Sequence, residues 1–181
     1  TSNNENWKKI ILPTGPFGEN HNKYNHAAAR DLNNDGFMDV VVAVTRDNPY
    51  YEGAYIQVLI NDGFGTLIDE TSSRFTNQSR ENNHHGEGNI YLRDMNNDNF
   101  IDIVHSTRDY SSGYHGAHIA LNDGYGNFNS IPNGDLPDRP DKGSNQYDML
   151  MKGLPINADN SSCLDLISVT DVGWGDANED T

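Results

Sequence analysis

An acidic stretch near the start of the sequence spaces its oxygen-bearing side chains as a calcium site requires. Asp31, Asn33 and Asp35 alternate with other residues, and Asp39 occupies the ninth position, after which the chain continues into apolar residues 40–42. Calcium is a hard cation that binds about six to eight oxygen atoms. A tightly curved loop can direct side chains 1, 3 and 5, carbonyl 7 and carboxylate 9 to one point. The spacing therefore predicts a calcium loop.

The same pattern recurs twice, each time 63 residues further along the chain, and a fixed period of this size indicates a repeat protein. In the third copy Asn157 and Ser161 replace two carboxylates, which weakens the donor set. We therefore expect two complete calcium sites and a weaker third. The predicted metal ligands are Asp31, Asn33, Asp35, the carbonyl of Phe37 and Asp39; then Asp94, Asn96, Asp98, the carbonyl of Phe100 and Asp102; then Asn157, Asp159, Ser161, the carbonyl of Cys163 and Asp165.

An EF-hand is the alternative with a similar start, but it needs a glutamate at position 12 and a helix on each side. Position 12 is Val42, His105 or Ser168 in the three copies. Each loop is followed by a short apolar or β-branched run, which is typical of a strand. The loop is therefore expected to join two strands.

The elements that position the loops are predicted to be four antiparallel strands in each repeat. Asn61–Gly65 and Asn122–Gly126 each contain Asp-Gly, a strong signal for a tight turn between strands. A further strand is expected at Trp7–Pro13. The predicted strands lie at about 26–31, 39–45, 54–60 and 66–71, at about 88–94, 101–107, 117–121 and 127–132, and at about 147–152 and 164–170.

From about Trp7 to Val169 the sequence resembles the FG-GAP or VCBS repeats, which are found in integrin α-subunit head domains and in secreted bacterial proteins. Residues 26–42, 61–65 and 122–126 carry this resemblance. It implies an all-β fold of β-propeller blades, each with four antiparallel strands. About two and a half repeats are present, so we expect a partial propeller or a piece of a larger one, because a closed ring needs about four to eight blades.

The expected organisation has four parts. These are an N-terminal strand at 1–14 that completes a neighbouring blade, repeat 1 at 15–76, repeat 2 at 77–139 and an incomplete repeat 3 at 140–181.

The charge balance excludes several classes of function. The chain has 12 Lys and Arg against 27 Asp and Glu, a net charge of -15. Nucleic acids and anionic membranes are therefore unsuitable partners, because both need clustered basic residues. No apolar run reaches the roughly 20 residues of a membrane-spanning helix, and Thr1 does not begin a signal peptide. Calcium loops of this type fill where calcium is plentiful, which favours a secreted, extracellular or cell-surface protein.

Strand direction places the connections between the second and third strands at the end opposite the calcium loops. Polar and aromatic residues recur there and suit a glycan or protein ligand. The alternative, which the recurrence in each repeat favours, is that Arg and Asp pairs hold neighbouring blades together. The candidate ligand-binding residues are Arg46, Asp47, Tyr50, Tyr51, His84, Arg108, Asp109, Tyr110, Tyr114 and Trp174.

Three functions are consistent with the sequence. The favoured one is a calcium-stabilised extracellular module for recognition or adhesion, without catalysis. The second is part of a polysaccharide lyase or hydrolase, with His84 or Tyr110 as base beside Arg108, an analogy with other propellers. The third is self-assembly, since the strand at Trp7–Pro13 and the incomplete third repeat would leave exposed sheet edges.

Overall fold

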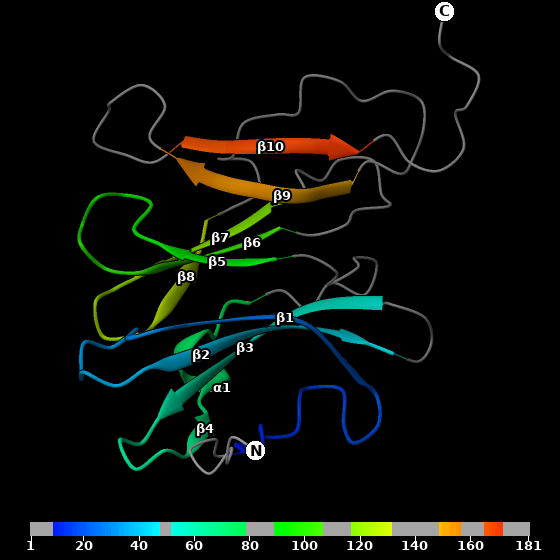
Figure 1. The fold of residues 1–181 in the computed structure, drawn as a ribbon, viewed down its shortest axis with the longest axis vertical. Coiled ribbons are helices and arrows are strands. Elements are labelled where there is room, and N and C mark those ends of the chain that lie inside the picture. The colour runs from blue at the N-terminus through cyan, green and yellow to red at the C-terminus, as the bar shows by residue number, and fades with distance from the viewer. Residues whose placement is uncertain are drawn as a thin grey trace, which may run out of the picture.

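The computed structural model describes residues 9–47, 52–78, 89–106, 117–131, 149–156 and 165–171. These residues form two four-stranded antiparallel sheets and one two-stranded antiparallel sheet (Figure 1). The all-β expectation is thus confirmed for the described part of the chain, where the sheets form an open stack and no closed ring.

The first sheet contains β1 (Asn22–Arg30), β2 (Asp39–Arg46), β3 (Glu52–Asn61) and β4 (Leu67–Asp69) in sequence order. Its central strands are rich in Val and Ile, which suit a pleated surface that is buried on both sides. The side chains of Val41, Val42 and Val44 are at most 1% exposed. The strands therefore carry two apolar faces, and each must be covered.

The second sheet repeats this order with β5 (Ile90–Arg93), β6 (Asp102–Ser106), β7 (Ala117–Asn122) and β8 (Phe128–Ser130). A third sheet pairs β9 (Met149–Ile156) with β10 (Asp165–Asp171). β1 packs against β5 and β6 packs against β9, so the three sheets lie one above another (Figure 1).

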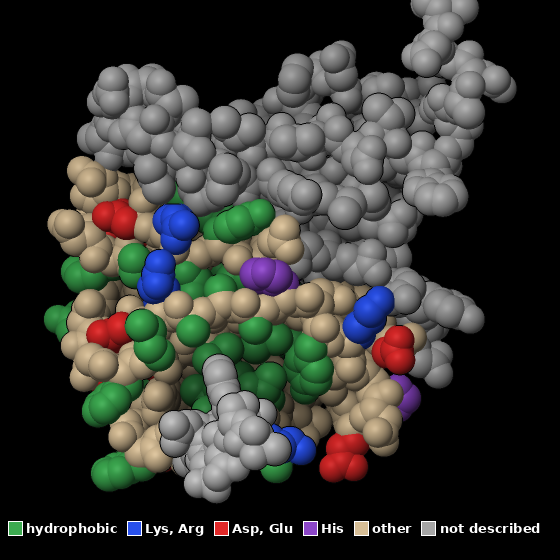
Figure 2. All heavy atoms as spheres, in the orientation of Figure 1, with side chains coloured by type: hydrophobic (Ala, Val, Ile, Leu, Met, Phe, Trp, Pro, Cys, Tyr) green, Lys and Arg blue, Asp and Glu red, His purple; other side chains and the backbone are tan. Residues whose placement is uncertain are grey.

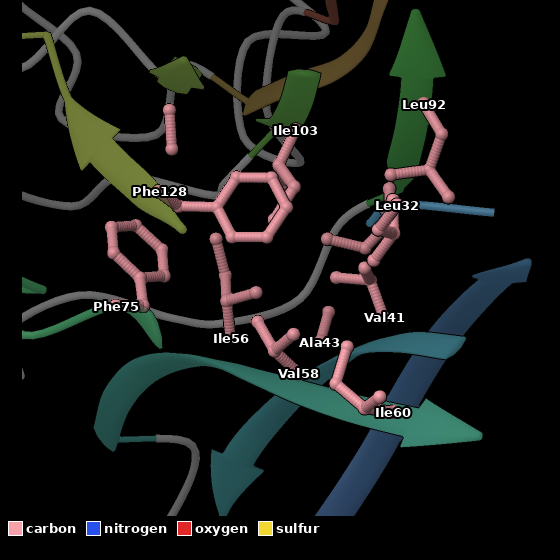
Figure 3. Close-up of a cluster of buried hydrophobic side chains, with 12 residues drawn as sticks. Leu32, Val41, Ala43, Ile56, Val58, Ile60, Phe75, Leu92, Ile103 and Phe128 are labelled. Atoms are coloured by element: carbon pink, nitrogen blue, oxygen red, sulfur yellow. The ribbon is translucent and has the colours of Figure 1, made fainter. Parts of the chain in front are cut away.

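The main hydrophobic core lies between the first two sheets (Figure 3). Every second residue of a strand contributes to this core, because successive side chains of a strand point to opposite faces. The first sheet and its adjoining loop contribute Leu32, Val41, Ala43, Ile56, Val58 and Ile60, and Phe75, Ile90, Leu92, Ile103, Ala120 and Phe128 complete the core.

The other face of the first sheet is covered by residues 12–17. Leu12 and Phe17 pack against a cluster that includes Val42 and Tyr55, and the Phe17 and Tyr55 rings meet edge to face. The hydroxyl of Tyr24 accepts a hydrogen bond from Gly15 N at 3.1 Å. This irregular segment thus buries a sheet face that would otherwise be open to water.

Several strand bounds differ from those predicted. β1 begins at Asn22 rather than near His26, because the polar residues before His26 pair with β2 across a bulge. Residues 9–13 of the expected strand at Trp7–Pro13 are not in a strand. β4 ends at Asp69, where Asp69 Oδ1 accepts hydrogen bonds from the amide and hydroxyl of Thr71 and ends the extended backbone.

A short helix, α1 (Thr71–Arg74), follows that turn and was not predicted. Four residues are too few for a helical pattern to be visible in the sequence. In the described part of the chain, no helix has the length and apolar character needed to cross a membrane.

Polar contacts also join the first two sheets. The buried side chain of Asn122 donates through Nδ2 to the carbonyl of Leu32 in the first sheet's loop, at 2.8 Å, and to that of Ile101, at 3.0 Å. Its Oδ1 accepts from Gly124 N and Gly126 N. Asn122 therefore stabilises its own turn and links that turn to the neighbouring sheet by a hydrogen bond.

The replacement Asn122→Ala should destabilise the protein by about 2 to 4 kcal/mol, since buried carbonyl and amide groups would lose their partners. Asn61 is the matched control, because it holds the equivalent turn of the first sheet with bonds to Gly63 N and the Met38 carbonyl but reaches no second sheet. Asn61→Ala should cost about 1 kcal/mol. Urea unfolding of both variants measures the difference, and equal losses would contradict an inter-sheet role for Asn122.

Candidate metal loops

The first predicted calcium loop joins β1 to β2, and its side chains curl inward onto its own backbone. Asp31 accepts hydrogen bonds from Asp35 N through Oδ1, at 3.1 Å, and from Gly36 N through Oδ2, at 2.9 Å. Asp35 Oδ1 accepts from Phe37 N at 2.8 Å, and Asn33 Nδ2 donates to Asp35 Oδ2 at 2.9 Å. The odd-numbered side chains thus turn toward the inside of one loop.

The second loop, between β5 and β6, has the same arrangement. Asp94 accepts from Asp98 N at 3.1 Å and from Asn99 N at 2.8 Å. Asp98 Oδ1 accepts from Phe100 N at 2.8 Å, and Asn96 Nδ2 donates to Asp98 Oδ2 at 2.8 Å. The two loops therefore repeat in hydrogen bonding as well as in sequence.

Two positions of each loop adopt a left-handed backbone conformation. Asn34 and Asn97 both have φ of 61°, while Gly36 has φ of 89° and its counterpart Asn99 has φ of 69°. Glycine and asparagine tolerate positive φ better than other residues. The second loop therefore keeps the fold of the first although it lacks the glycine.

The ninth-position aspartates, Asp39 and Asp102, are completely buried and connect three parts of each sheet. Asp39 accepts from Leu32 N in the loop and from Asn61 N at the end of β3, both at 2.9 Å. Asp102 accepts from Met95 N at 2.7 Å and from Asn122 N at 2.8 Å. Each carboxylate therefore holds its loop, the start of a strand and the following turn together.

Burial raises the pKa of Asp39 above its ordinary value, and the amide hydrogen bonds of Asn61 and Leu32 only partly oppose this. Repulsion from the nearby charges of Asp35 and Asp31 raises the pKa further. Burial likewise raises the pKa of Asp102. A cation among these carboxylates would favour their ionised forms, because opposite charge stabilises the anion.

The turn after β3 packs against the first loop. A side chain at Gly63 would meet the Phe37 ring, whose nearest atom lies 2.8 Å from the Cβ position. A side chain at Gly124 would likewise meet the Phe100 ring, whose nearest atom lies 2.6 Å from the Cβ position. The aromatic residue at position 7 of each loop thus packs on a glycine, so the loop and the turn form one unit.

The donor chemistry fits calcium, since each loop offers carboxylate, amide and carbonyl oxygens and no nitrogen or sulfur ligand is needed. Among the described residues, no three Asp, Glu, His or Cys side chains converge closely enough to hold a metal by themselves. An ion in the first loop would therefore also need the oxygen of Asn33 and the carbonyl of Phe37. In the third loop, Asn157, Asp159, Ser161 and Cys163 lie outside the described residues, and Asp165 begins β10.

The candidate ligand-binding residues at the opposite end are only partly described. Arg46 ends β2 and Asp47 follows it, with Asp47 N donating to the His21 carbonyl at 2.8 Å. These two residues lie at the end of the sheet away from the loops. The candidates Tyr50, Tyr51, His84, Arg108, Asp109, Tyr110, Tyr114 and Trp174 lie outside the described residues.

The sequence interpretation did not identify Asn61 and Asn122 as partners of the metal loops. Both begin an Asn-Asp-Gly turn, and both backbone amides donate to the ninth-position aspartate. The recurrence of asparagine before Asp-Gly was the available signal, because a hairpin turn alone does not require it.

The replacement Gly36→Ala should destabilise the protein by about 1 kcal/mol, because a β-carbon disfavours positive φ. No atom lies within 4 Å of the added carbon, so the cost comes from the backbone and not from a clash. Asn99→Gly at the equivalent position should be neutral or slightly stabilising. Chemical unfolding in EDTA tests both, and an unchanged stability of Gly36→Ala would show that the loop can relax.

A family model described as the FG-GAP-like repeat matches residues 31–105, from the first metal loop through most of β6. No solved structure matches the chain. The matched stretch contains both loops whose hydrogen bonds are equivalent, together with the strands and the turn that support the first. The match over residues 31–105 thus confirms the resemblance to FG-GAP repeats for that part of the chain.

Proposed function

We propose that this protein is a calcium-stabilised extracellular module of the β-propeller type that serves recognition or adhesion and has no catalytic role. The observation that carries the proposal is the pair of equivalent loops, each ending on a buried aspartate that also holds a strand and a turn. Metal binding at such a position would act on the whole sheet and not on a surface loop alone.

Charge supports the same conclusion. The chain has a net charge of -15, and three aspartates lie close together in each of these two loops. Like charges at close range oppose folding. One calcium ion in the first loop would offset two of the three charges of Asp31, Asp35 and Asp39. Calcium at about one hundred times its dissociation constant would stabilise the fold by about 2.7 kcal/mol for each site.

A recognition role is supported by the repeat architecture, in which the first two stacked sheets present similar loops and turns at the metal-loop end. Arg46 and Asp47 lie at the end opposite the metal loops, where we propose that a glycan or protein ligand binds. If this is so, immobilised glycans should retain the calcium-loaded protein without being cleaved. Release of unsaturated sugar products would contradict a non-catalytic role.

Calcium removal is the direct test of the metal proposal. EDTA should lower the melting temperature, and calorimetric titration should return at least two calcium ions per chain. Asp35→Asn should remove one binding event, because it deletes a carboxylate from the first loop. Asp62→Asn is the matched control, since Asp62 is an exposed turn aspartate whose Oδ1 bonds to Phe64 N and Thr66 N can be kept by asparagine.

An unchanged melting temperature in EDTA would exclude a structural role for calcium. Loss of a binding event in the Asp62→Asn control would instead show that the turns, and not the loops, take up the ion.

The calcium effect should also depend on pH. Asp39 and Asp102 have a raised pKa in the metal-free fold, so lowering the pH toward that pKa stabilises the metal-free protein relative to its unfolded chain. With calcium present, protons compete with the ion and lower pH weakens binding. Melting curves in calcium and in EDTA should therefore converge as the pH falls. A constant gap between them would contradict the assignment of these carboxylates as ligands.

A further inference from the structure

The tips of the two equivalent turns carry exposed aromatic residues that the fold does not explain. Phe64 lies between β3 and β4 and is 90% exposed, and Tyr125 lies between β7 and β8 and is 74% exposed. Large side chains exposed to this degree add no burial energy. Aromatic residues at the same position of two repeats therefore suggest contact with another molecule.

Other residues set the conformation of these turns. Asp62 Oδ1 accepts hydrogen bonds from Phe64 N at 2.8 Å and from Thr66 N at 3.0 Å. Asp123 Oδ1 accepts from Tyr125 N at 2.9 Å and from Asn127 N at 3.2 Å. The ring at each tip could thus be replaced without loss of any of these bonds.

Both tips lie at the metal-loop end and are held in place. The Phe37 and Phe100 rings pack on the glycines that precede the tips. The Tyr125 carbonyl accepts from Arg74 Nη1 at 2.6 Å, which links its turn to the first sheet's helix. Figure 2 shows separate hydrophobic side chains along this end of the molecule, with acidic and basic side chains near them.

Each exposed ring stands two residues from an exposed aspartate. Amide hydrogen bonds from Thr66 and Phe64 lower the pKa of Asp62. For Asp123, burial acts to raise the pKa, but hydrogen bonds from Asn127 and Tyr125 outweigh it and the pKa is lowered. Both side chains are therefore negatively charged at neutral pH.

The nearby charges leave this end acidic. Arg74, the basic residue that reaches the Tyr125 turn, forms an ion pair with Glu70, with Nε and Oε2 2.7 Å apart. Arg30 and Arg93 end β1 and β5 at this same end, but at the edge of each sheet away from the turns. A calcium ion in the first loop would still leave its three aspartates with a net charge of about -1.

We propose that Phe64 and Tyr125, with Asp62 and Asp123, form a docking surface for a lysine- or arginine-rich segment of a partner protein. A cation over an aromatic face is attracted by the ring, and a neighbouring carboxylate adds a direct charge contact. A second copy of this chain is disfavoured because it carries the same charge of -15. A neutral glycan would stack on the rings but would not need an ionised aspartate beside each one.

This surface rests on the proposed recognition role but is a second site, at the metal-loop end, separate from the one proposed near Arg46 and Asp47. The test uses the calcium-loaded full chain and three probes, decalysine, decaarginine and decaglutamine, at physiological salt. The two basic peptides should bind, and decaglutamine should not. Phe64→Ser with Tyr125→Ser should weaken binding about tenfold, because two exposed cation–aromatic contacts are lost.

Asp62→Asn with Asp123→Asn should weaken binding by a similar factor, while asparagine can still accept the amide bonds of the turn. The control, Glu19→Gln, removes one exposed charge elsewhere on the chain and is compared with Asp62→Asn or Asp123→Asn alone. It should change the affinity less than twofold.

Equal weakening by the control and the aspartate variants would overturn the proposal, because only net charge would matter. Full retention of binding by the serine variants would overturn it as well, and so would ring-dependent binding of neutral glycans. These outcomes leave calcium binding and its effect on the melting temperature unaffected, so a failure here differs from a failure of the proposed function.

Discussion

The buried carboxylates of Asp39 and Asp102 are the constraint on which the rest of the structure depends. Each removes a charged group from water, which is costly unless hydrogen bonds compensate. The compensating donors come from distant parts of the chain, with Leu32 N and Asn61 N serving Asp39. A loop, the start of a strand and a turn must therefore form together. Burial raises the pKa of both carboxyls, so the amide hydrogen bonds offset the cost of burial only in part.

The unit built around each carboxylate has two apolar faces, and stacking is how the chain covers them. Val41 faces the second sheet, and its counterpart Val104 belongs to a separate cluster on the far side of the second sheet. Each sheet thus has one face toward the preceding layer of the stack and the other face toward the following layer. Side chains between the sheets then determine their register, with Asn122 reaching Leu32 and the His26 ring accepting from Ile90 N at 3.1 Å.

Local chemistry made the loops and most strands predictable from the sequence. Alternating Asp and Asn before a β-branched run implies both the curled loop and the strand that follows, and Asp-Gly marks the turn. Contacts between distant residues were not predictable in this way. Asn34 Nδ2 donates to the Gly124 carbonyl, 90 residues away, and no periodic pattern encodes that bond. The covering of the first sheet by residues 12–17 was missed for the same reason, because Leu12 and Phe17 lie in an irregular segment.

The position of a sheet in the stack explains where the repeats differ. Ile90 and Leu92 of β5 are buried against the first sheet, whereas their counterparts in β1, Ala27 and Ala29, are exposed. Residues 12–17 cover the middle of that face but leave the β1 side open to water. Large apolar residues there would add exposed surface without burial energy, and alanine avoids it. The same strand position thus carries a large residue where a sheet covers it and a small one where water does.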